Sequence, residues 1–262
     1  RVFANGRGIP AQSPVPPGTY GYDPDYRNRH RQKDIEKARQ IMIEAGYPNG
    51  IDPDTDQPLR LTFDTADTSS AGLLTYQFYT DAWRAIGLDV RVDATNGNQF
   101  QEKIRNGAYQ IFIWGWIADY PDPENFLFLL WSEMARSRNN GPNSANFANA
   151  KYDELFSAMR RRENDPERLR IIREMVLLLE EECPWIPLTH WESYLLYHEW
   201  YKNAKPTDLM VPTFKYQDVD TVTRSHYQIA NNRPIRWPLY VALIGLVAMI
   251  VPAVITFFRE RQ

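Results

Sequence analysis

Residues 109–131 carry the sequence YQIFIWGWIADYPDPENFLFLLW, in which an apolar run is followed by a loop rich in carboxylates and indole rings. The continuous run 111–114 is typical of a strand buried on both faces of a mostly parallel sheet. Asp122 and Pro123 predict the start of a helix that continues to Trp131, because proline is favoured at the first helical position. Open α/β sheets bind ligands where the carboxyl end of a strand meets a helix, so we expect a ligand site in the intervening loop.

The loop contains residues of two kinds. We expect Asp122 to cap the following helix and Trp114, inside the strand, to be a core residue. Trp116 and Asp119 fall after the strand and before the cap, where neither role applies. On patterning alone, Asp119 is either a binding residue or an ordinary surface carboxylate.

The segments before this loop alternate between helical and strand patterns. Helical spacing of apolar residues predicts helices at 34–45, at 71–86, in a short stretch ending at 107, and later at 151–162 and 165–182. Alternation of apolar and polar residues predicts strands at 59–63 and 88–92, and weaker patterns predict strands at 185–189, 194–197 and 214–219. The order β-α-β-α-β predicts a parallel sheet.

Composition narrows the class of protein. The chain has 262 residues, of which 43% are hydrophobic and 24% charged, as in one or two folded domains. A net charge of −3 and a pI near 5.9 argue against a nucleic-acid partner. The four histidines show no metal-binding spacing and no glycine-rich nucleotide motif occurs, so we expect no metal and no cofactor. The single cysteine, Cys183, is expected to be a buried structural thiol.

Residues 239–258, LYVALIGLVAMIVPAVITFF, form a run of 20 residues without a charge. A helix of this length, at about 1.5 Å per residue, crosses a hydrocarbon core of about 30 Å. Trp237 and Tyr240 suit one membrane interface, and Arg259 and Arg261 suit the other. We therefore predict a transmembrane helix whose orientation is not set by charge, because arginines flank both of its ends.

Several longer motifs occur in a characteristic order. They are YDPDY at 22–26, GYPNG at 46–50, AIGLDVRV at 85–92, GWIADYPDPENF at 115–126, SANFANAKYDEL at 144–155, NDPERLRIIREM at 164–175 and CPWIPL at 183–188. Together they make residues 1 to about 224 resemble the extracellular solute-binding proteins of family 5, the dipeptide and oligopeptide receptors of ABC importers. The resemblance implies an α/β fold, the C-terminal lobe of a type II periplasmic binding protein with a mixed sheet flanked by helices. It also implies that this chain lacks the N-terminal lobe against which it closes.

The resemblance and the apolar run together imply an organisation in five parts. These are an irregular entry segment at 1–20, the binding lobe at 21–224, a linker at 225–238, a transmembrane helix at 239–258 and a cytoplasmic tail at 259–262. The lobe is expected on the periplasmic or extracellular side of the cell membrane, to which the single span would anchor it.

The resemblance also implies ligand-binding roles for Gly115, Trp116, Ile117 and Asp119. The family's peptide-binding acid follows the tryptophan of this loop, which corresponds here to Asp119, and in peptide-binding members it pairs with the α-ammonium of the ligand. Residues 115–117 match the segment whose backbone pairs with an extended peptide as an added strand. Ile113 departs from the basic residue that some oligopeptide receptors carry at this position.

We therefore expect a membrane-anchored substrate-binding subunit of an ABC importer, without catalytic activity, that delivers di- or oligopeptides to permease subunits. Relatives that bind nickel chelates or oligosaccharides keep the same scaffold, so these solutes are alternatives. Two other classes are a hydrolase that uses the carboxylates of Asp119, Asp122 and Glu124, and a sensory ectodomain that signals through its span. The short tail after Phe258 disfavours the sensor. Residues 139–149, which are rich in asparagine, either form plain turns or line a cleft.

Overall fold

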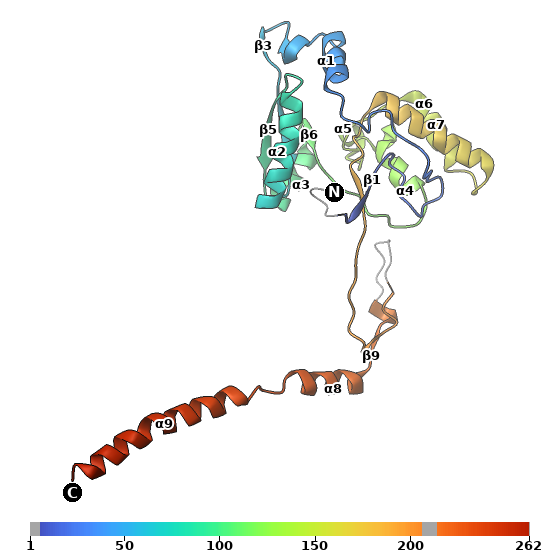
Figure 1. The fold of residues 1–262 in the computed structure, drawn as a ribbon. Coiled ribbons are helices and arrows are strands. Elements are labelled where there is room, and N and C mark those ends of the chain that lie inside the picture. The colour runs from blue at the N-terminus through green and yellow to red at the C-terminus, as the bar shows by residue number, and fades with distance from the viewer. Residues whose placement is uncertain (1–5, 206–213, 262) are drawn as a thin grey trace. The chain divides into compact units, whose positions relative to one another are not determined.

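The computed structural model describes residues 6–205 and 214–261, which divide into two compact units (Figure 1). The first unit contains the described residues up to Tyr194, and the second contains those from Leu195 onward.

A three-stranded parallel sheet in the first unit confirms the predicted β-α-β-α-β order (Figure 1). Its strands lie in the order β5-β4-β6, with β4 at Arg60–Thr65, β5 at Asp89–Ala94 and β6 at Ile111–Phe112. Helix α2 (Ser70–Arg84) connects β4 to β5, and α3 (Gly97–Asn106) connects β5 to β6. The antiparallel pairs form separate two-stranded ladders.

The two helices cover opposite faces of this sheet, because side chains alternate along a strand. Phe63 and Val90 pack with Tyr76 of α2 on one face. The next residue of β4, Asp64, points the other way and pairs with Lys103 of α3. The sheet therefore has an aromatic core on the α2 side and a buried ion pair on the α3 side.

The second core of this unit is helical. It is built by α6 (Ala150–Met159) and α7 (Pro166–Glu182), onto which pack α4 (Glu124–Leu127) and the 3₁₀ turn η2 (Phe128–Leu130). Its largest fully buried side chains include Tyr152, Phe156, Met159, Ile172 and Met175. The turns η3 (Ser132–Met134) and α5 (Arg136–Asn139) precede α6. The loop 113–123 thus runs from the end of β6 to α4 and joins the sheet to the helical core.

Side-chain caps start five of the helices in the regions where helices were predicted. The oxygens of Asp34, Ser69, Asn96, Asn149 and Asp165 each accept a backbone N–H three residues later, at the first turns of α1 (Ile35–Glu44), α2, α3, α6 and α7. Gly107 ends α3 in the left-handed conformation. These helices were predictable because each is started by a local cap.

The remaining elements of the first unit are short. After α1, the turn η1 (Pro48–Gly50) leads into the hairpin of β2 (Ile51–Asp52) and β3 (Gln57–Pro58). β1 (Gly8–Pro10) pairs antiparallel with β7 (Thr189–Trp191). Gly50 has φ +73°, and a Cβ there would lie 2.0 Å from the carbonyl oxygen of Gly87. Only glycine fits at this contact between the turn and the end of α2.

The second unit contains β8 (Tyr201–Lys202), the turn η4 (Phe214–Tyr216), β9 (Asp218–Val219) and helices α8 (Thr221–Asn231) and α9 (Trp237–Arg259). β8 and β9 pair antiparallel. The most apolar 18-residue window of helix α9 has a mean hydropathy of 2.7, and none of the residues of the helix is buried. It is long and apolar enough to cross a membrane.

Several predictions were wrong in detail. Residues 194–197 are not a strand, and the strand predicted at 214–219 is a 3₁₀ turn followed by the two residues of β9. Helix α8 occupies residues that we had divided between the lobe and a linker. Cys183 is exposed rather than buried, because α7 ends at this residue in a left-handed turn at the surface.

The strand predicted at 111–114 is also shorter than expected. Only Ile111–Phe112 pairs with β4, and Trp114 is 53% exposed rather than a core residue. β6 is the last strand of the sheet, so its end has a neighbour on one side only. Trp114 instead lies against Phe100 of α3, with ring centroids 5.8 Å apart.

Candidate functional site

The loop that follows β6 is held in place by one buried amide. Asn125 of α4 is 3% exposed, and its side-chain oxygen accepts two hydrogen bonds. One comes from the indole N–H of Trp116 and the other from the backbone N–H of Asp119, each over 3.0 Å. A single acceptor thereby fixes both the ring and the residue that carries the carboxylate, while Ala118 between them is buried.

The same loop leaves its other side chains exposed. Trp114, Trp116, Ile117 and Tyr120 are all large apolar residues at the surface. The carboxylate of Asp119 is exposed among them, and within the part of the chain that the structure describes it has no hydrogen-bond or ion-pair partner. An anion among exposed aromatic rings is suited to a ligand with a cationic group and an apolar body.

The backbone of the first half of this loop also has unpaired groups. Ile113 donates its N–H to the carbonyl of Asp64 over 3.3 Å, which extends the pairing of β6 with β4 by one hydrogen bond. Among the described residues, the backbone groups of 114–117 form no hydrogen bond, and no atom lies within 4 Å of a Cβ built on Gly115. This edge can therefore accept an added extended chain.

Asp122 has a structural role. Its two oxygens accept bidentate hydrogen bonds from Arg168 over 2.7 and 2.8 Å, and one of them also accepts the backbone N–H of Glu124 over 2.9 Å. Burial alone would raise the pKa of Asp122, but the hydrogen bonds from Arg168 and from the backbone of Glu124 outweigh it and lower the pKa. The predicted cap is therefore wrong in detail: Pro123 occupies the N-cap position and α4 ends at Leu127, whereas Asp122 supports the start of α4 from one residue earlier.

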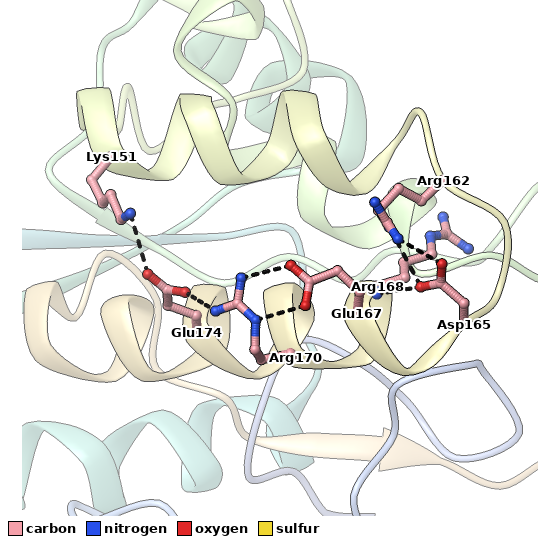
Figure 2. A network of polar contacts seen from close by, with 7 residues as sticks. All are labelled: Lys151, Arg162, Asp165, Glu167, Arg168, Arg170 and Glu174. Carbon is pink, nitrogen blue, oxygen red and sulfur yellow. Dashed lines mark hydrogen bonds and ion pairs between the residues drawn. The ribbon is translucent and has the colours of Figure 1, made fainter.

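Arg168 differs from the other arginines of its helix because it is buried. Its side chain is 5% exposed and also donates to the carbonyl of Met159 over 3.1 Å. Figure 2 shows the neighbouring pairs, in which Arg170 bonds to Glu167 and to Glu174 along the outer side of α7. These exposed pairs contribute little to stability, whereas the pair of Arg168 with Asp122 ties α7 to the candidate loop.

The remaining candidates separate into two groups. Gly115, Trp116, Ile117 and Asp119 lie on one exposed loop. Glu124, the carboxylate of the alternative hydrolase, is instead paired: it accepts a hydrogen bond from the hydroxyl of Tyr120 over 2.6 Å.

Two residues of the asparagine-rich segment serve the helical core. Asn143 is fully buried and donates to the carbonyls of Trp131 and Phe147, and Asn149 caps α6. In the described residues, no group of three His, Cys, Asp or Glu residues is placed to hold a metal. An open hollow of about 440 Å³ beside Trp131 is lined by none of the predicted site residues.

Two residues of the site were not singled out from the sequence. Asn125 lies inside the motif GWIADYPDPENF, where it is a polar residue next to a run of apolar ones. Arg168 lies on the same stripe of α7 as the buried Ile171, Ile172 and Met175. A charged residue at a helical position otherwise used for core packing was the available signal for Arg168.

Comparison with known proteins matches residues 1–137 to the bacterial extracellular solute-binding proteins, family 5 Middle. The chain is 29% identical over 187 residues to Heme-binding protein A of Haemophilus influenzae, covering 71% of this chain and 32% of that protein. It is 24% identical over 185 residues to the oligopeptide-binding protein OppA of Bacillus subtilis, covering 70% and 32%. The chain thus spans about a third of the length of these relatives.

Solved structures show the same fold. The periplasmic binding protein DppA of Helicobacter pylori, in complex with the peptide STSA, superposes with a TM-score of 0.62 at 25% identity and covers 72% of this chain and 34% of that one. An oligopeptide-binding protein of Borrelia burgdorferi gives a TM-score of 0.65 at 21% identity, over 83% and 42%. The predicted α/β lobe of a type II periplasmic binding protein is confirmed, and this chain belongs to the bacterial extracellular solute-binding proteins of family 5.

Proposed function

We propose that this chain is the C-terminal lobe of the substrate-binding subunit of an ABC importer, and that it captures peptides outside the cytoplasmic membrane for delivery to a permease. The proposal rests above all on the carboxylate of Asp119, which is exposed and has no partner among the described residues. The side-chain oxygen of the buried Asn125 fixes the backbone that carries it. Family membership and the peptide bound to the H. pylori relative support it.

The geometry explains how such a site would recognise many peptides. Backbone groups of 114–117 would pair with an extended ligand in the manner of an added strand, which reads no side chains. Asp119 would then fix the register by accepting the ligand's α-ammonium, and Trp116 and Ile117 would contact its apolar parts. Specificity for a free N-terminus would therefore come from one charge.

Closure by a second lobe is needed for that charge to act strongly. Two unit charges 4 Å apart attract by about 1 kcal/mol in water and by about 4 kcal/mol at an effective dielectric constant of 20. Asp119 is exposed in this lobe, so its pair with an ammonium gains strength only when a facing surface excludes water. We therefore propose that the ligand is enclosed between this lobe and an N-terminal lobe.

The test is a thermodynamic double cycle in the full-length protein that contains this chain, in which the carboxylate of residue 119 and the α-ammonium of the peptide are removed singly and together. Calorimetry compares di- to pentapeptides with their N-acetylated forms, using the wild type, Asp119→Asn and the control Glu124→Gln. We expect Asp119→Asn to weaken binding of free peptides by about tenfold or more, the equivalent of about 1.4 kcal/mol. N-acetylation should weaken binding to the wild type and to Glu124→Gln, and it should make little further difference in Asp119→Asn.

Equal affinities of the wild type and Asp119→Asn for free peptides would reject the role of Asp119. If no peptide binds to any variant, the same calorimetry with a nickel chelate, an oligosaccharide or heme tests the other ligand classes. Heme is included because Heme-binding protein A is among the similar proteins.

A hydrolase is disfavoured by the partners of the loop carboxylates. Asp122 is held by Arg168 and Glu124 by Tyr120, so neither is free to act as the second member of an acid–base pair with Asp119. Family 5 solute-binding proteins are transport components rather than enzymes, which supports the same conclusion. Turnover of a peptide or glycan by the purified protein would contradict it.

We further propose that α9 anchors the lobe to the membrane. At about 1.5 Å per residue, its 23 residues extend about 35 Å, enough to cross the hydrocarbon core. A tether of this kind would raise the effective concentration of the receptor at its permease. Persistence of the protein in the membrane fraction after an alkaline wash is the expected result, and release by the wash would contradict the anchor.

A further inference from the structure

Among the residues that the structure describes, the contacts of helix α8 with the rest of the second unit lie along one side. Asp220 caps the helix by accepting the backbone N–H of Thr223 over 3.0 Å and its hydroxyl over 2.8 Å. One turn later, the ring of Tyr227 lies 5.4 Å from that of Trp200, and its hydroxyl donates to Glu199 over 2.5 Å. The side of α8 that carries Thr223 and Tyr227 therefore faces the residues around the β8–β9 hairpin.

A different side of α8 carries a row of two aliphatic side chains with an imidazole between them, which forms its apolar stripe. Val222, His226 and Ile229 are separated by four and three residues, which places them in one row along a helix. Val222 is 79% exposed and Ile229 is 66% exposed. The same spacing places Arg224 and Gln228 away from this row, so the helix is amphipathic with its apolar side open.

The chain itself limits what this stripe can meet. Only residues 232–236 separate α8 from α9, and a link of this length reaches at most about 20 Å. If α9 crosses a membrane, the end of α8 lies within that distance of the hydrocarbon core. The headgroup layer covers the first several ångströms outside the core, so α8 can reach it. Two aliphatic side chains would bind a free lipid surface only weakly, but the link keeps them beside one.

The charges of this segment also match a lipid surface. Between residues 221 and 236 there are three arginines, Arg224, Arg233 and Arg236, and no aspartate or glutamate. Arginines at the surface of a bilayer are attracted to anionic headgroups, and each strengthens the attachment by about fivefold. The segment thus combines an apolar stripe with an excess of positive charge, which is the pattern of helices that lie in a membrane interface.

We propose that α8 lies in the headgroup layer of the membrane that α9 spans, with Val222, His226 and Ile229 turned to the lipid and the three arginines at anionic headgroups. The proposal rests on the membrane anchor proposed above. It makes α8 a part docked on the bilayer surface rather than a flexible linker, because the ring and hydroxyl of Tyr227 hold α8 against Trp200 and Glu199, just before β8.

The test measures the depth of single fluorescent labels in the full chain, reconstituted in vesicles of phosphatidylcholine with phosphatidylglycerol. Cys183→Ser removes the native thiol, and one cysteine is then introduced by Ile229→Cys or by Gln228→Cys, its neighbour on the polar side. We expect aqueous iodide to quench the Ile229→Cys label several-fold less than the Gln228→Cys label. Lipids with a nitroxide near the headgroup should quench the two labels in the opposite order.

A label at Leu243→Cys, inside α9, separates the possible failures. If nitroxides on the acyl chains quench it while iodide quenches the labels of Ile229→Cys and Gln228→Cys equally, the placement of α8 is wrong and the span stands. If iodide reaches the label of Leu243→Cys, the anchor itself fails and the placement of α8 falls with it. Peptide calorimetry on the full-length protein that contains this chain reports the ligand proposal independently of either outcome.

Vesicles of phosphatidylcholine alone test the electrostatic part. There the ratio of docked to free α8 should fall by about fivefold for each arginine that meets an anionic headgroup. If the Ile229→Cys label is protected from iodide to the same extent without phosphatidylglycerol, the role of the arginines is overturned.

Discussion

The substitution Asp122→Asn tests whether the pair of Asp122 with Arg168 is structural while its neighbour Asp119 is functional. Asparagine keeps the shape of the side chain but removes the negative charge opposite a guanidinium that is 5% exposed. Removing one partner of a buried ion pair costs about 3 to 5 kcal/mol. Asp122 is itself 30% exposed, and the asparagine oxygen can still accept one hydrogen bond, so we expect a smaller loss of about 2 kcal/mol.

The assay is urea unfolding of the full chain in detergent micelles, with tryptophan fluorescence as the measure of the unfolded fraction. For a domain of this size a loss of about 2 kcal/mol lowers Tm by about 4 to 8 °C, which a thermal scan resolves. Asp119→Asn is the matched control, because it removes the same charge three residues earlier from an exposed side chain. We expect Asp119→Asn to change the free energy of unfolding by less than about 0.5 kcal/mol.

The pH dependence of the difference between wild type and Asp122→Asn has a definite sign. Because the folded protein lowers the pKa of Asp122 below its ordinary value of 3.8, the stabilisation is fully present above that value. It is lost as the pH falls through the lowered pKa. The difference should therefore be constant from neutral pH down to about pH 4 and shrink only below it.

Two results would refute this reasoning. An Asp122→Asn variant as stable as the wild type would show that Arg168 does not need its partner. An Asp119→Asn variant as unstable as Asp122→Asn would show that Asp119 is a structural residue and would remove it from the ligand site.

Three further predictions concern other single residues. Asn125→Ala leaves the N–H groups of Trp116 and Asp119 without their acceptor, so calorimetry should show peptide affinity lowered about tenfold, the equivalent of about 1.4 kcal/mol. Asn125→Asp keeps the accepting oxygen and should retain most of the peptide affinity. Glu180→Gln should lose about 2 kcal/mol in urea unfolding at neutral pH, because Glu180 is 5% exposed and binds Arg29. Although burial acts to raise the pKa of Glu180, hydrogen bonds lower it, so this stabilisation should be present above pH 4.5 and be lost below the lowered pKa. Gly50→Ala should lower Tm by several degrees, since its methyl group would meet backbone 2.0 Å away, whereas an unchanged Tm would show that the turn shifts freely.

The elements that the sequence predicted well are those whose signals are local. Asp34, Asp165 and Gly107 act on backbone groups within a few residues, so the ends of α1, α7 and α3 followed from the chain alone. The parallel order of the sheet followed from the alternation of helices and strands. The family motifs pointed to the loop that contains Asp119 and to its neighbours, but they did not show its environment.

The tertiary structure decided what depends on residues far apart in the chain. Arg168 meets Asp122 across 46 positions, because α7 packs beside the start of α4, and no local pattern encodes that distance. Trp114 is exposed because β6 lies last in the sheet, which strand order determines and hydrophobicity does not. Within the part of the chain that the structure describes, the carboxylate of Asp119 has no partner, because the packing of the lobe uses the neighbouring carboxylates of Asp122 and Glu124 and leaves this one in solvent.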